Sequence, residues 1–196
     1  MYAQLNTKTV FSFMDATVKL TDYITAAKTL GYQTLGISDV DNLHAAHQFI
    51  TQAKAAGIQP VIGYETTLLL DGLAINFTFI AKTNAGLQNL YSISSKKNFG
   101  YNNFSDIHSH LCDVALILPA DSAVDSILTH LPQNDVFVGL AQPMAQGFLR
   151  PTIPFLSVRY LNAGDAETLA ILHHVKNGTK YDDSLTSNHF ESLRLE

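Results

Sequence analysis

Residues 35–65, LGISDVDNLHAAHQFITQAKAAGIQPVIGYE, constrain the fold of this chain more than any other stretch. A short, mostly apolar run at 34–38 predicts a strand, and a helix is expected to start at about residue 43 and to end at the left-handed Gly57. A second strand opens at Pro60. The predicted unit is therefore strand, helix, strand, and its helix should turn one apolar stripe toward a sheet: Leu43, Ala46, Phe49, Ile50 and Ala53.

Each strand of this βαβ unit ends in a carboxylate, Asp39 after the first and Glu65 after the second. Two strands that are joined through a helix lie parallel, so their carboxyl ends meet at one edge of the sheet. Sheets and barrels of this kind place their sites at that edge. Asp39 and Glu65 are therefore the first candidate site residues.

Alternating strands and helices continue through the rest of the chain. A turn at Asp71-Gly72 predicts a hairpin, Asn84 is expected to cap a helix with the stripe Leu87, Leu90, Tyr91 and Ser94, and 98–103 is expected to be a loop. About seven alternations favour an α/β barrel over an open sheet. The other strands are expected at 3–8, 64–70, 73–81, 114–118, 136–141 and 155–158, and the other helices at 21–30, 123–131 and 166–175.

Composition sets bounds on the class of protein. A length of 196 residues suits one domain, which we assign to 1–194, with 195–196 as a cloning scar. The formal net charge of −5 disfavours strong nucleic-acid binding by this domain. The sequence shows no membrane-spanning run and no signal peptide, which predicts a cytoplasmic protein, and the single Cys112 is expected to be a small buried residue.

Four motifs, in this order and spacing, resemble one family. Phe11 to Ala16 resembles Y-S-L-L-D-G, the 35–65 stretch resembles L-T-D-H-G-N-L followed by K-P-I-I-G-x-E, 80–90 resembles L-A-K-N-E-x-G-Y-x-N-L, and 158–167 resembles V-H-Y-L followed by D-A-E. These are motifs of the PHP (polymerase and histidinol phosphatase) domain at the N-terminus of bacterial DNA polymerase III alpha subunits. The resemblance implies an α/β fold, a distorted seven-stranded (β/α) barrel, and a chain that is part of a longer polymerase.

The resemblance also implies where a metal centre would lie. Active PHP domains hold two or three divalent ions between histidines and carboxylates, and a metal-bound hydroxide attacks the phosphate. Of the ligand positions, only Asp39 and Glu65 keep a residue of the family pattern, and a position usually held by cysteine falls near Asp121. We therefore expect a vestigial site with neither a metal nor a catalytic residue. The substituted positions are Asn6, Lys8, Val40, Asn76, Ser157 and Arg159.

Other histidines offer a way to rebuild the centre. His44 and His47 are three apart on one helix, and His108 and His110 form a second close pair in a predicted loop. Solvated or capping roles for these side chains, and for His173-His174, are the expected alternative. A rebuilt centre would make the domain an active metal-dependent phosphoesterase or 3′–5′ exonuclease with Zn or Mn.

The function expected from the resemblance is that of a non-catalytic, metal-free module in DNA replication. The fragment itself should need no cofactor, whereas the polymerase core of the parent DNA-directed DNA polymerase, a nucleotidyltransferase, would use Mg. The expected partners are the remainder of the alpha chain and, as a candidate, a separate proofreading exonuclease or other replisome subunit. Neither a membrane nor strong nucleic-acid binding is expected.

Two of the substituted positions hold cations, Lys8 and Arg159. Two carboxylates in a partly buried pocket need cations or a proton. We therefore predict that Lys8 or Arg159 lies within roughly 4 Å of Asp39 or Glu65 and replaces the metal charge.

Overall fold

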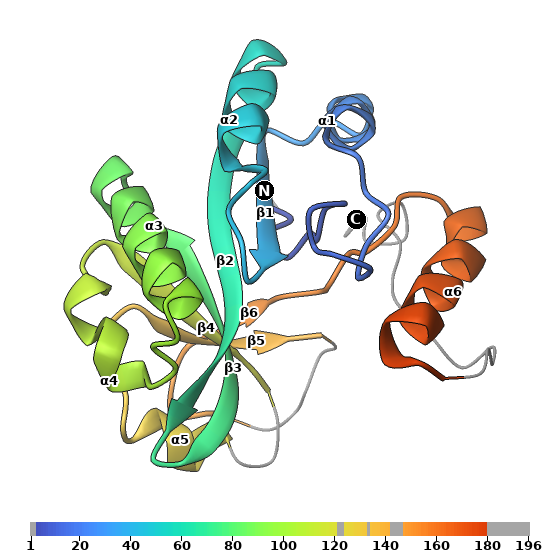
Figure 1. The fold of residues 1–196 in the computed structure, drawn as a ribbon. Coiled ribbons are helices and arrows are strands. Elements are labelled where there is room, and N and C mark those ends of the chain that lie inside the picture. Colours follow the sequence, from blue (N-terminus) through green and yellow to red (C-terminus); the bar gives the residue numbers. More distant parts are fainter. Residues whose placement is uncertain (1–2, 121–123, 133, 142–146, 180–196) are drawn as a thin grey trace. The chain divides into compact units, whose positions relative to one another are not determined.

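The computed structural model describes residues 3–120, 124–132, 134–141 and 147–179 (Figure 1). The chain groups into two compact units. Unit 1 combines Met1–Val61 with Ser157–Glu196, and unit 2 is Ile62–Leu156.

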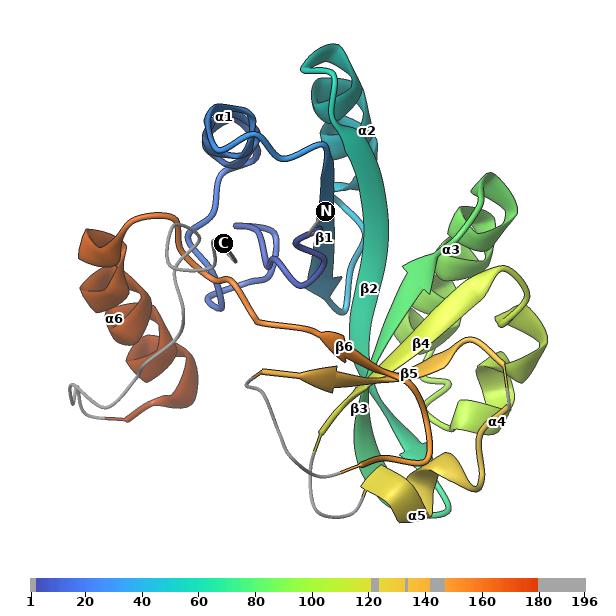
Figure 2. The ribbon, with the colours of Figure 1, turned by 180° about the vertical axis from the view of Figure 1, so that it is seen from behind.

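Unit 1 is built mainly of helices around one strand. The helices of unit 1 can be followed in Figure 2. Tyr23 and Phe49, both fully buried, come from two of them and stack with 6.4 Å between ring centroids. Its elements are α1 (Leu20–Thr29), β1 (Thr34–Val40), α2 (Ala46–Ala55), the start of β2 (Gln59–Leu70), η2 (Ala163–Asp165) and α6 (Ala166–Asn177).

Unit 2 contains most of the strands. Its longest helix, α3, packs along β3 and β4 (Figure 1). The elements are the rest of β2, β3 (Leu73–Ala81), α3 (Asn84–Asn98), α4 (Phe104–Ile107), η1 (His108–His110), β4 (Val114–Pro119), α5 (Val124–Leu128), β5 (Val136–Leu140) and β6 (Thr152–Pro154).

The six named strands follow one another in a single sheet, in the order β1-β2-β3-β4-β5-β6. The β2–β3 and β3–β4 pairs are antiparallel, and the β4–β5 and β5–β6 pairs are parallel. The α/β class predicted from the sequence is therefore confirmed. Closure into a seven-stranded barrel stays a prediction.

The predicted first strand is present as a hydrogen-bonded segment rather than as a named strand. Gln4 forms a parallel bridge with Leu35 of β1, and Thr7 forms one with Val158. Gly36 N–H donates to Gln4 O at 2.7 Å, and Lys8 N–H donates to Val158 O at 2.9 Å. The segment thus pairs with β1 on one side and with the residues around Val158 on the other, and β6 lies earlier than the predicted strand at 155–158.

Local turn chemistry was predicted correctly at two places. Asp71 and Gly72 have φ of 50° and 81°, and they join Leu70 and Leu73 in a two-residue hairpin turn. Gly57, with φ of 79°, follows α2 as the predicted left-handed stop.

α6 starts at the predicted residue 166, whereas α2 starts three residues later than predicted and α3 has a different cap. α2 begins at Ala46 instead of residue 43, because Asn42 Oδ1 accepts from His44 N at 3.2 Å and holds a turn before the helix. α3 is capped by Thr83, whose hydroxyl accepts from Gly86 N, and not by Asn84. Tyr91, one of the residues predicted for this helix, lies in α3 and is 43% exposed.

The segment after α3 is more ordered than predicted. Phe104 is buried against Phe77, with ring centroids 5.0 Å apart, and this contact holds the four-residue α4. His108 and His110, predicted in a loop, lie in η1. Cys112 is exposed, so the prediction of a buried cysteine was wrong. It lies in the turn that joins η1 to β4, where its carbonyl accepts from Asn89 at 2.8 Å.

Within the described ranges, no helix combines the length and hydropathy that crossing a membrane requires. The cysteine position predicted near Asp121 and the tail after residue 180 lie outside the described residues.

Gly36 provides a test of the contact between β1 and the N-terminal segment. A Cβ at this position would lie 2.9 Å from Leu5 Cα, so Gly36→Ala should lower the free energy of unfolding by roughly 1–3 kcal/mol. The matched control is Gly164→Ala, because nothing lies within 4 Å of a Cβ there. Urea unfolding measures both variants. Equal stability of the two would contradict the close approach.

Candidate functional site

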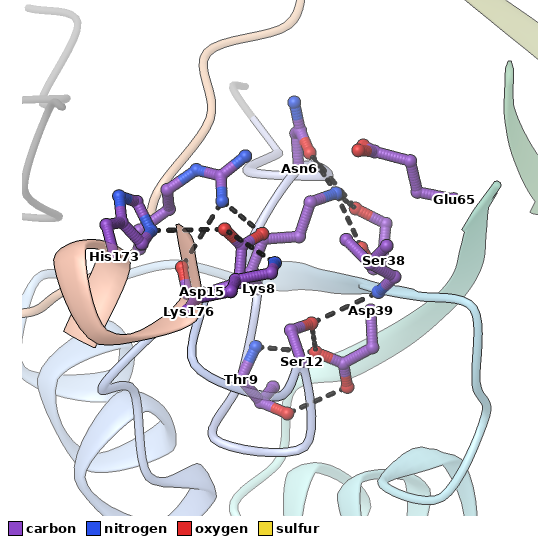
Figure 3. A network of polar contacts seen from close by, with 12 residues as sticks. Asn6, Lys8, Thr9, Ser12, Asp15, Ser38, Asp39, Glu65, His173 and Lys176 are labelled. Atoms are coloured by element: carbon purple, nitrogen blue, oxygen red, sulfur yellow. Dashed lines mark hydrogen bonds and ion pairs between the residues drawn. The ribbon is translucent and has the colours of Figure 1, made fainter. Parts of the chain in front are cut away.

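A buried lysine occupies one of the substituted ligand positions of unit 1. Lys8 is fully buried, and its Nζ donates to Asn6 Oδ1 at 2.8 Å, to Ser38 O at 2.6 Å and to Ser38 Oγ at 3.0 Å (Figure 3). Ser38 Oγ in turn donates to Asn6 Oδ1 at 3.1 Å. Asn6 and Lys8 therefore lie together, as their i, i+2 spacing predicts. They form a polar cluster that stabilises a buried positive charge.

Asp39 points toward a different set of partners. Its Oδ1 accepts from Thr9 N and from Ser12 Oγ, both at 2.6 Å, and its Oδ2 accepts from Thr9 Oγ1 at 2.7 Å (Figure 3). Ser12 Oγ also accepts from the N–H of Val40 at 3.1 Å. Asp39 is 2% exposed, and its two oxygens anchor the loop that follows Lys8.

Arg159, the other cation among the ligand positions, is bound by Asp15. Its Nη1 forms an ion pair with Asp15 Oδ2 and donates to the Asp15 carbonyl at 3.2 Å. Two side chains of α6 approach Asp15 Oδ1 (Figure 3). His173 Nε2 lies 3.1 Å away but is not aligned for a hydrogen bond, and Lys176 Nζ lies 3.7 Å away.

The electrostatics of Asp15 follow from these neighbours. Burial by itself raises the pKa of Asp15, but the charge of Arg159 and its hydrogen bond, with Lys176 and His173, outweigh burial. The pKa of Asp15 therefore lies below its ordinary value of 3.8. Asp15 is ionised at neutral pH and joins the N-terminal loop to α6.

Two predicted site residues lie in unit 2, on neighbouring strands. Glu65 of β2 is 9% exposed, and its Oε1 accepts from Asn76 Nδ2 of β3 at 3.1 Å. Its Oε2 accepts from Thr78 Oγ1 at 3.4 Å. The structure thus brings the predicted Glu65 and Asn76 together by a cross-strand hydrogen bond.

The remaining candidates are Ser157 and the histidines. Ser157 Oγ is buried and has no hydrogen-bond partner among the described residues. His44 is exposed in the turn before α2, His47 is exposed on α2, and His108 is exposed in η1. In the part of the chain that the structure describes, no group of three or more His, Cys, Asp or Glu side chains could hold a metal ion.

The residues of unit 1 at the implied ligand positions do not fit a divalent ion. Lys8 and Arg159 offer donors and positive charge where a metal needs lone pairs. The two oxygens of Asp39 already accept three short hydrogen bonds from Thr9 and Ser12. A metal would have to displace these donors and lie beside an ammonium group.

The prediction that Lys8 or Arg159 replaces the metal charge has two parts, one for Asp39 and one for Glu65. Asp39 is held by hydroxyl and backbone donors, and Arg159 binds the carboxylate of Asp15, so the part that concerns Asp39 was wrong. Thr9 and Ser12 already supply hydrogen-bond donors to both oxygens of Asp39, so a cation is not needed as a partner. The part that concerns Glu65 stays a prediction.

Sequence reasoning assigned no role to Asp15, Thr9 or Ser12. Asp15 was visible as the acidic residue of the Y-S-L-L-D-G motif, and His173 and Lys176 are three apart on one helical face. Its contact with Arg159 spans 144 residues of sequence, which no local pattern reveals.

Comparisons with known proteins place the chain in a family. The model of the PHP domain matches residues 4–142. The chain belongs to the PHP domain family. It is 36% identical over 90% of its length to DNA polymerase III subunit alpha of Streptococcus pyogenes serotype M3, and 31% identical over 98% to that of Staphylococcus epidermidis. The chain spans only 17% and 19% of these relatives.

Solved structures show weaker similarity. A protein described as a metal-dependent phosphoesterase, from Bifidobacterium adolescentis, aligns over 48% of this PHP chain and 32% of its own, with a TM-score of 0.40 and 18% identity. An amidohydrolase from Chromobacterium violaceum aligns over 50% and 34%, with a TM-score of 0.38 and 17% identity. The family assignment rests on the sequence comparisons.

Asp39 should stabilise the domain through the loop that it anchors. Asp39→Asn replaces an accepting oxygen by an amide that faces a donor, and it should lower the free energy of unfolding by about 2 kcal/mol. The control Asp22→Asn changes an exposed carboxyl group of α1 and should stay within about 0.5 kcal/mol. Thermal and urea unfolding give both values. An Asp39→Asn variant as stable as the control would contradict the role of the anchor.

Asp15 should make stability depend on acid pH. The pKa of Asp15 is lower in the folded chain than its ordinary 3.8. The contribution of Asp15 to the free energy of unfolding is therefore fully present at pH values above its pKa in the unfolded chain. The contribution is lost as the pH falls through the folded pKa. Urea unfolding from pH 5 downward should show the difference between the unsubstituted chain and Asp15→Asn shrinking. A constant difference would mean that Asp15 is not held ionised by its neighbours.

Proposed function

We propose that this chain is a metal-free, non-catalytic PHP domain that acts as a structural and interaction module of a DNA polymerase III alpha subunit. The observation that supports this most is the buried ammonium of Lys8, at a position where the family pattern has a histidine ligand, donating to Asn6 and Ser38. Asn6, at the partner histidine position, acts as an acceptor for a lysine.

Hydrolysis by a PHP domain would require metal ligands at the positions that Lys8 and Asp39 occupy. A PHP hydrolase needs a bound hydroxide, and metal ions lower the pKa of water to generate it. Lys8 donates within its cluster, and Asp39 holds the loop of Thr9 and Ser12. These hydrogen bonds support the proposal that neither cluster supplies a metal ligand or a general base for water.

The replication role rests on the polymerase relatives. The stretches that match make up less than a fifth of each relative, so the polymerase activity, its Mg and its DNA substrate belong to the proposal for the whole protein. The remainder of the alpha chain is the proposed first partner, and a separate exonuclease or replisome subunit is a candidate second one. The proposed location is the bacterial cytoplasm, and the proposed complete fold is a seven-stranded barrel that forms one domain.

The purified chain should bind no catalytic metal. Its melting temperature should be the same with chelator and with millimolar Mn or Zn, because no ligand set gains free energy from binding. It should leave single-stranded DNA and phosphate monoesters intact in each metal. Differential scanning fluorimetry and a gel assay of labelled DNA give the two readouts.

The rival function, an active phosphoesterase or exonuclease, would give the opposite results. A saturable rise in melting temperature with one metal, together with turnover that Glu65→Gln abolishes, would refute the proposal. Turnover that is unchanged by Glu65→Gln would instead identify a contaminating nuclease. Glu65 is the position tested because its hydrogen-bond partners, Asn76 and Thr78, are side chains of β3. Asp39 is unsuitable for this test because its substitution would also release Thr9 and Ser12.

A further inference from the structure

Helix α6 has two faces of opposite character. Leu169 and Ala170 are buried, and His173 approaches Asp15 from the same side. Ile171 and Val175, one helical turn apart, are 48% and 60% exposed. At 100° per residue these two side chains project roughly opposite to His173. The outward side of α6 therefore carries an apolar stripe, Ile171 and Val175, where a surface helix usually carries polar residues.

The ionic contacts fix which face points outward. His173 and Lys176 approach the carboxylate of Asp15, which Arg159 also binds. Turning α6 by half a turn would bury Ile171 and Val175, but it would carry both basic side chains away from Asp15. The helix is held in this orientation, so the stripe stays exposed within unit 1.

We propose that the stripe is a docking surface for a part of the polymerase chain that lies outside these 196 residues. This inference rests on the proposed function. The match covers only 17% and 19% of the two polymerase relatives, which are several times longer than this chain. Under the proposed function, most of the polypeptide therefore lies outside the structure. The occupant should present aliphatic or aromatic side chains, because burying Ile171 and Val175 against apolar groups stabilises the contact.

The small size of the stripe favours an occupant on the same polypeptide. Two partly exposed aliphatic side chains offer far less than the roughly 800 Å² per partner of a stable complex between separate chains. A tethered segment meets the stripe at an effective concentration in the millimolar range, so a small apolar contact is sufficient. A second copy of the chain or an independent protein would need a larger surface.

Photo-crosslinking in the full-length polymerase tests the proposal. Val175→p-benzoylphenylalanine should crosslink within one polypeptide to residues outside these 196, identified by mass spectrometry of digested peptides. The same probe at the exposed Lys28 of α1 is the control and should give no dominant product. A main product within these 196 residues, with a second copy or with another protein would overturn the proposal, as would no product at all.

A second measurement does not depend on the probe. Ile171→Ser combined with Val175→Ser should leave the melting temperature of the 196-residue chain unchanged, because the face is exposed there. In the full polymerase the same pair should lower the melting temperature of the PHP region by several degrees. An equal effect in both chains would overturn the proposal. Neither readout uses metal or hydrolysis, so metal-dependent turnover would refute the proposed function without changing the crosslink.

Discussion

The buried ammonium group of Lys8 in unit 1 is stabilised by the amide, hydroxyl and carbonyl groups around it. A fully buried ammonium group is costly unless each of its donors meets an acceptor. Lys8 meets Asn6 and Ser38 at hydrogen-bonding distances, and Ser38 is a residue of β1. The lysine thus ties the N-terminal segment to β1 through its side chain, in addition to the backbone bridge between Gln4 and Leu35 and the hydrogen bond from Ser38 N–H to Thr7 O.

Two carboxylates of unit 1 complete this arrangement from opposite ends of one loop. Asp39 holds the start of the loop through Thr9 and Ser12, and Asp15 holds its end through Arg159. In this loop, between Ser12 and Asp15, Met14 has φ of 54°. Non-glycine residues adopt this conformation only where surrounding contacts stabilise it. The acidic residues here act as anchors of backbone and helix.

Under the proposed function, a polar cluster of the chain takes the place of metal ligands. A histidine cluster that binds metal gathers lone pairs around a cation, whereas Lys8 carries its positive charge on a side chain and donates to Asn6 and Ser38. Substituting one ligand by lysine would leave a repelled metal, but pairing it with Asn6 and Ser38 gives a site that is satisfied by the chain itself. The acidic clusters and the lysine cluster remain separate within unit 1, each with its own partners.

The sequence by itself determined the features that depend on neighbouring residues. The βαβ order, the hairpin at Asp71-Gly72 and the left-handed stop at Gly57 follow from backbone conformations that few residues adopt. Family membership followed from motif order. Only the tertiary structure decided which partner each charged side chain contacts. Lys8 and Ser38 are 30 residues apart in the sequence, and Arg159 and Asp15 are 144 apart. Long side chains have several partners within reach, and the choice depends on packing and desolvation across the whole unit.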